Sequence, residues 1–122
     1  MDVIRELHTV ISRTSILFFA ILGVWGLIRA FRGQRVESSY LGALVIGEGV
    51  FVLQAVLGTI LIIAGGRPGR MIHLLYGAVA LIALPALFAY RKGDDSNQAQ
   101  WYYAILTTLL TGIAFRAIST AV

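Results

Sequence analysis

Cysteine is absent from the 122-residue chain, and charged side chains are scarce. Without cysteine there is no disulfide framework, no Cys-x-x-Cys pair and no Cys-x-x-Cys-His motif for covalent haem attachment. Charged residues make up 13% of the sequence, about half of the roughly 25% that is usual for a soluble domain. A soluble four-helix bundle, which carries charge along its outer faces, is therefore disfavoured.

Catalytic and nucleotide-binding signatures are also missing from the sequence. It has no glycine-rich nucleotide loop, no His-Glu-x-x-His motif and no Ser-His-Asp constellation. The net charge is +4, but the basic residues flank apolar segments and do not form one face, so no nucleic-acid partner is expected. These absences disfavour a soluble, stand-alone enzyme.

The chain contains long apolar segments and few charged residues. Hydrophobic residues make up 58% of it, and the mean hydropathy is +0.83. Each of four segments reaches the roughly 20 residues that span a bilayer core, and a barrel would need at least eight strands. We therefore expect an all-α membrane protein with residues 1–122 as a single domain, and with helices at about 2–31, 39–64, 71–90 and 101–121.

Short loops between these segments force neighbouring helices to be antiparallel, which predicts an up-down-up-down bundle in the lipid bilayer. Basic residues favour one side of the membrane by five to three: Arg29, Arg32, Arg35, Arg91 and Lys92 against Arg5, Arg67 and Arg70. This bias places both termini outside, in a bacterial inner (plasma) membrane. Six aromatic residues are expected to form a belt at the inner interface: Trp25, Tyr40, Tyr90, Trp101, Tyr102 and Tyr103.

The chain has two histidines, His8 and His73, near the starts of the first and third predicted helices. In such a bundle these helices are parallel and diagonal, so both imidazoles lie at the outer side and face each other across the core. Diagonal axes are about 11–14 Å apart, a gap that two imidazoles with an iron between them would fill. Small residues follow each histidine at i+4 and i+7, where a macrocycle would lie: Ser12, Ser15, Gly77 and Ala80.

Two arginines lie unusually deep in the predicted membrane. Arg13 and Arg116 are both on the histidine side, and no acidic residue is at their level. A buried charge of this kind needs a partner, and haem propionates would supply one. Arg70, in the turn before the third helix, could serve the same purpose. The alternative is that Arg13 and Arg116 extend to the lipid headgroups.

The stretch Gln54-Ala55-Val56-Leu57-Gly58, followed by apolar sequence, a short turn and then His73, resembles the haem A synthase family. The resemblance covers about residues 46–90, and it implies that the chain is similar to one of that family's two fused four-helix bundles. It also implies that His8 and His73 are axial ligands and that Gln54 and Gly58 lie beside the haem. The chain departs from the family in two ways. Its Glu6 is two residues before the first ligand instead of three, and it has one histidine pair where the family has two, so a homodimer would be needed to supply two bundles.

Other interpretations remain open. The histidines could each bind a chlorophyll in a photosynthetic complex, or the chain could be an accessory subunit of a respiratory complex without a cofactor. Glu48, an acid in the second predicted helix with no basic residue at its level, could serve a small transporter or accept a structural hydrogen bond. We favour a b-type cytochrome that binds one haem b per chain non-covalently and passes electrons to a redox partner or a larger membrane complex.

Overall fold

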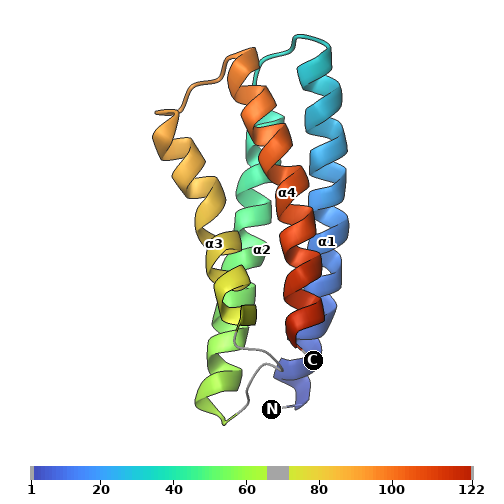
Figure 1. Ribbon diagram of the computed structural model, residues 1–122, viewed down its shortest axis with the longest axis vertical. Helices are drawn as coiled ribbons and strands as arrows, with labels where there is room; N and C mark the ends of the chain where they lie inside the picture. The colour runs from blue at the N-terminus through green and yellow to red at the C-terminus, as the bar shows by residue number, and fades with distance from the viewer. Residues whose placement is uncertain (1, 66–71, 122) are drawn as a thin grey trace.

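The protein folds into four α-helices, and the computed structural model describes residues 2–65 and 72–121. They are α1 (Asp2–Phe31), α2 (Ser38–Ile63), α3 (Ile72–Tyr90) and α4 (Asn97–Ala121) (Figure 1). The described part of the chain contains no strand. Each helix is long and apolar enough to cross a membrane, so the prediction of an all-helical chain with four such segments is confirmed.

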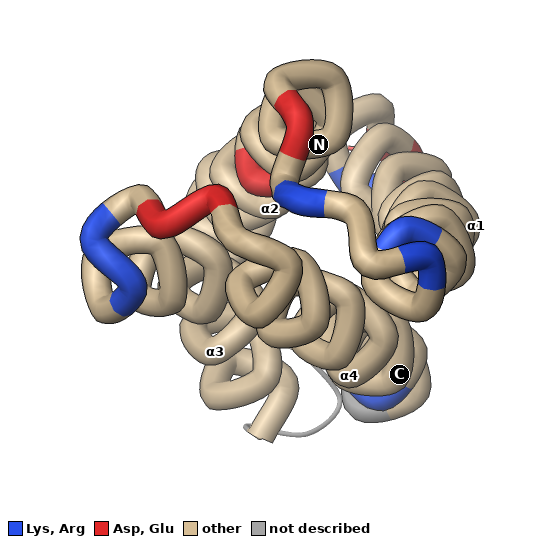
Figure 2. Tube along the Cα trace, turned by 90° about the horizontal axis from the view of Figure 1, so that it is seen from above, with Lys and Arg blue, Asp and Glu red and all other residues tan. Residues whose placement is uncertain are grey.

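The helices lie side by side, in the order α1, α2, α3 and α4 around the molecule (Figure 2). The closest packing is between α1 and α4, whereas α3 packs against α4 and more loosely against α2. Helices α1 and α3 are therefore diagonal. The start of α1 and the start of α3 lie at the same end of the molecule, and residues 32–37 and 91–96 lie at the other end (Figure 1).

Close approach of α1 to its neighbours depends on glycine in the α1 surface. A Cβ atom on Gly26 would overlap the hydroxyl of Tyr40 and would lie 3.2 Å from the Cα of Ala104 on α4. Tyr40 and Gln100 are fully buried beside this glycine. The Tyr40 hydroxyl donates to the carbonyl of Leu22 at 3.4 Å, and Gln100 Nε2 donates to the carbonyl of Gly26 at 3.3 Å. These polar side chains link the helices inside the bundle.

Two of the six aromatic residues expected at the membrane interface belong instead to the core. Tyr40 is 0% exposed and Tyr103 is 2% exposed, so their assignment to an aromatic belt was wrong. The hydroxyl of Tyr40 has a partner inside the protein, which removes the reason for it to face a polar interface. The segment expected to begin at residue 101 also begins earlier, at Asn97.

A cap explains the early start of α4. The Ser96 hydroxyl accepts the backbone N–H of Ala99 at 3.2 Å, as an N-cap residue does. The backbone N–H and the hydroxyl of Ser96 both donate to the Asp94 carboxylate. These bonds, with a smaller contribution from Arg91, lower the pKa of Asp94.

Ion pairs gather on the two loops at this end of the molecule, where acidic and basic residues lie together (Figure 2). Arg29 pairs with Glu37, Arg35 pairs with Asp95, and Arg91 pairs with Asp94: these pairs hold the α1–α2 and α3–α4 loops. The backbone N–H of Val36 also donates to the carbonyl of Asp95 at 2.9 Å. The two loops therefore form one connected end of the bundle.

Substitution of Gly26 tests the close packing of α1. Gly26→Ala should lower the free energy of unfolding by about 1–3 kcal/mol, because the added methyl group overpacks the contact with buried Tyr40. Gly42→Ala is the matched control, since a Cβ there meets no atom of the described residues within 4 Å. The control should gain roughly 0.5–1 kcal/mol from helix propensity. Circular dichroism during thermal unfolding in detergent measures both, and equal stability of the two variants would contradict the packing.

Candidate functional site

The two histidines are in contact across the bundle, although 65 positions separate them in the sequence. His8 lies in the second turn of α1, and His73 lies in the first turn of α3. Their ring centroids are 6.2 Å apart, and the ring planes are inclined at 77°. Both side chains are half-buried. The structure thus brings together the two residues that were predicted from the sequence to be a ligand pair.

His73 is held by a backbone group of α4. Its Nδ1 atom lies 2.6 Å from the carbonyl oxygen of Ala117. A carbonyl oxygen accepts but cannot donate, so Nδ1 carries a proton and donates it in this hydrogen bond. In the neutral imidazole, Nε2 then keeps its lone pair. This is the arrangement found in metal-binding histidines, whose second nitrogen usually donates to a carbonyl or a carboxylate.

α2 contacts His8 mainly through Gln54 and Gly58. Gln54 Nε2 donates to the His8 carbonyl at 3.0 Å and to the hydroxyl of Ser12. The Ser12 hydroxyl in turn donates to the same His8 carbonyl at 2.7 Å. On the neighbouring turn of α2, a Cβ atom on Gly58 would lie 3.5 Å from His8 Cε1. The ring of His8 therefore lies directly against the α2 backbone.

Two polar atoms at this site are buried without a partner among the described residues: Nδ1 of His8 and Oε1 of Gln54. Buried polar atoms in native proteins are almost always hydrogen-bonded, and exceptions call for an explanation such as a bound group or a functional role. The orientation of the Gln54 amide is determined, because reversing it would place its oxygen against the His8 carbonyl. Of the two histidines, His8 is thus the one with an unpaired ring nitrogen and an unpaired acceptor nearby within the described residues.

Small residues line the helices beyond the histidines, as the sequence predicted. Ser15 on α1 and Ala80 on α3 are buried. A Cβ atom on Gly77 would meet nothing within 4 Å in the described part of the structure. The side chains next to the imidazole pair are consequently short, and no bulky group from these positions fills the space beside it.

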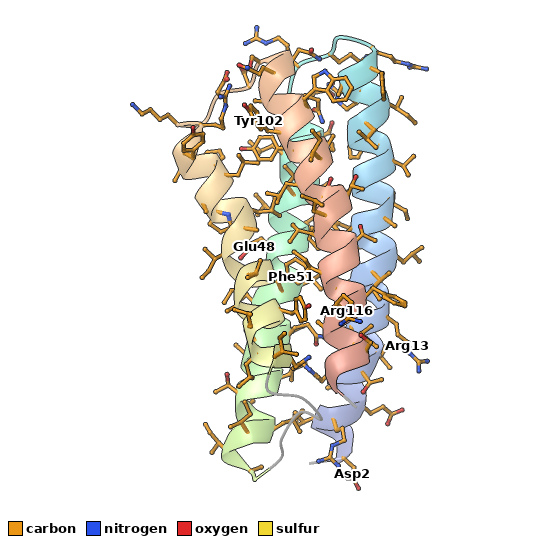
Figure 3. All side chains as sticks on the ribbon, in the orientation of Figure 1. Asp2, Arg13, Glu48, Phe51, Tyr102 and Arg116 are labelled. Carbon is orange, nitrogen blue, oxygen red and sulfur yellow. The ribbon has the colours of Figure 1, made fainter. Side chains whose placement is uncertain are left out.

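The arginines occupy different surroundings from the histidines. Arg13 is exposed on α1, and its side chain points away from the bundle, whereas Arg116 is exposed on α4 (Figure 3). Arg70 lies outside the described residues. Glu48 is half-buried on α2 and its Oε1 is buried without a partner in residues 2–65 and 72–121. It is six residues from Gln54 and ten from Gly58, about 9 Å and 15 Å along the helix axis, so it lies well away from the His8 ring beside Gly58.

Sequence reasoning missed two features of the site. It gave no sign of Ala117, because every residue carries a backbone carbonyl and only the packing of α3 on α4 selects this one. It treated Gln54 as a packing position beside a cofactor, whereas the side chain is a hydrogen-bond donor to the backbone of His8. An amide side chain in an otherwise apolar helix was the available signal, since such a group needs a partner inside the protein.

The contact between His8 and α2 can be tested with a larger side chain at Gly58. Gly58→Leu should displace the His8 ring and cost about 1–3 kcal/mol of stability through overpacking. Gly49→Leu on the same helix is the control, because a Cβ there has no neighbour within 4 Å among the described atoms. The ring signals of His8 in an NMR spectrum should move in the first variant and stay in the second. Unmoved signals in Gly58→Leu would contradict the contact.

Comparison with known proteins adds no relative to this description: no family model, no curated protein and no solved structure matches the chain.

Proposed function

We propose that the protein is a membrane-embedded b-type cytochrome. Its helices would span the bilayer as an up-down-up-down bundle, and His8 and His73 would ligate one haem b near the outer face. The observation that carries the proposal is the contact between the two imidazoles, from diagonal helices, at a centroid distance of 6.2 Å. Electron transfer is the function that such a site supports best.

The distance between the rings suits a shared metal ion. Imidazole nitrogens bind transition metals at about 2.0–2.1 Å, so two imidazoles on opposite sides of one ion have centroids about 6 Å apart. The angle of 77° between the planes is compatible, because each ring can rotate about its own metal–nitrogen axis. The hydrogen bond from His73 Nδ1 to Ala117 leaves Nε2 as the ligating atom.

The ligand count favours a macrocycle over a bare ion. Structural zinc takes four protein ligands, whereas residues 2–65 and 72–121 contain no group of three or more His, Cys, Asp or Glu side chains placed to hold a metal. Two imidazoles satisfy a haem iron, whose other four positions are filled by the porphyrin. The iron would supply a one-electron redox centre, and histidine at both axial positions favours electron transfer over oxygen chemistry.

Apolar side chains on the outer surface support insertion into a membrane. Large hydrophobic residues are exposed along α1, α2, α3 and α4, among them Leu17, Ile21, Val45, Ile82 and Phe115. Exposed apolar surface on this scale is expected where lipid replaces water. The excess of basic residues near residues 29–35 and 91–92 would place that end in the cytoplasm of a bacterium, with the termini and both histidines on the outer side.

Replacement of either ligand tests the cytochrome directly. His8→Ala and His73→Ala should each abolish the sharp reduced α-band of a low-spin haem, because one axial ligand is lost. Glu48→Gln is the control that should keep the wild-type spectrum, since Glu48 is ten residues, about 15 Å along the helix axis, from Gly58, which lies beside the His8 ring. Absorption spectra of oxidised and dithionite-reduced protein in detergent, with a pyridine haemochromogen assay, measure the outcome.

Free imidazole distinguishes loss of a ligand from loss of the fold. Added imidazole should restore a low-spin spectrum to a histidine-to-alanine variant that is still helical by circular dichroism. A colourless wild-type protein from haem-replete cells, or a haem spectrum unchanged in both histidine variants, would overturn the proposal.

A further inference from the structure

The two histidines differ in the hydrogen bonding of their Nδ1 atoms. His73 Nδ1 has a carbonyl partner on α4 at 2.6 Å. His8 Nδ1 is buried with no hydrogen-bond partner in the part of the chain that the structure describes. Because a buried polar atom left unpaired costs free energy, His8 Nδ1 calls for a hydrogen-bond partner, which is an acceptor if Nδ1 carries the ring proton.

Gln54 holds such an acceptor beside this ring. Both hydrogen bonds of its Nε2 atom, to the His8 carbonyl and to Ser12, fix the carboxamide next to the first turns of α1. Its Oε1 atom is buried and has no donor within residues 2–65 and 72–121. An unpaired acceptor and an unpaired ring nitrogen thus lie in the same region of the α1–α2 contact.

We infer that Gln54 is the positioning residue of His8: its Oε1 accepts the proton of His8 Nδ1 and so fixes the tautomer in which Nε2 has the lone pair. Gln54 Oε1 then has the same role for His8 on α1 as the Ala117 carbonyl has for His73 on α3: each accepts the Nδ1 proton. With both imidazoles in the same tautomer, the Nε2 atom of each ring has its lone pair available to a metal ion. This inference rests on the proposed function as far as the haem-bound protein is concerned. The tautomer of His8 can be tested in the haem-free protein.

Partners of this kind matter for metal binding because they orient the ligand and raise its basicity, and their loss typically lowers metal affinity 10–100-fold. Gln54 can hold the ring without carrying a charge, which suits a site among apolar helices. The second hydrogen bond of its Nε2, to the backbone of His8, ties the acceptor to the residue that it orients.

The test is the tautomer of His8 in the haem-free protein. With two histidines in the sequence, long-range proton–nitrogen NMR of histidine-labelled protein in detergent gives two sets of ring signals, which His8→Ala and His73→Ala assign. At a pH that keeps both rings neutral, wild-type His8 should carry its proton on Nδ1. In Gln54→Leu, the ratio of the Nδ1–H to the Nε2–H form should fall about fivefold, as expected for one net hydrogen bond.

Two further variants separate this role from general packing. Gln54→Glu keeps an acceptor oxygen and should keep His8 in the Nδ1–H form. Gln100→Leu is the same amide-to-leucine change at a buried glutamine of α4, which binds the Gly26 carbonyl near the opposite end of α1, and it should leave the His8 signals unchanged. A wild-type His8 in the Nε2–H form, or a ratio in helical Gln54→Leu equal to that of the wild type, would overturn the inference.

Titration with haemin distinguishes the two proposals. If both hold, the wild type binds one haemin per chain and Gln54→Leu raises the Kd about 10–100-fold. If the tautomer depends on Gln54 but the wild type binds no haemin, the positioning role stands and the cytochrome fails. If haemin binds equally to both and the tautomer does not change, the cytochrome stands and the positioning role fails.

Discussion

Hydrogen bonds from three polar side chains to backbone carbonyls of a neighbouring helix link these apolar helices at both ends of the bundle. At one end, Gln100 on α4 reaches the carbonyl of Gly26 on α1, and Tyr40 on α2 reaches that of Leu22. At the other end, Gln54 on α2 reaches the carbonyl of His8. Each bond joins two helices. In surroundings without water these bonds favour one arrangement of the helices, because any arrangement that leaves the polar group unpaired has a higher free energy.

The histidine site follows the same rule. His73 is fixed to α4 and His8 lies against α2, so all four helices contribute to the position of the imidazole pair. The pair lies near the starts of α1 and α3, which are at the same end of the bundle. The residues at the next turns are short, and a Cβ atom on Gly77 would meet nothing within 4 Å among the described residues. If a cofactor binds there, its histidine ligands are already oriented by the protein in the cofactor-free state.

Much of this fold was predictable from composition and spacing, because the length of an apolar run and the position of a histidine in it are read directly from the sequence. The pairing of His8 with His73 followed from the parallel direction of alternate helices. Burial was not predictable for Tyr40 and Tyr103, since an aromatic residue near a helix end suits either an interface or a core. The start of α4 depended on the Ser96 cap and the Asp94 side chain. The role of the Ala117 carbonyl depended on helix packing alone.

The central claim is that His8 and His73 share one haem iron. Low-temperature electron paramagnetic resonance of the oxidised protein, purified in mild detergent with its haem content determined, tests this claim most directly. The account predicts a low-spin ferric signal of the bis-imidazole type at one haem per chain. A high-spin signal, or a helical protein from haem-replete cells that contains no haem, would contradict it.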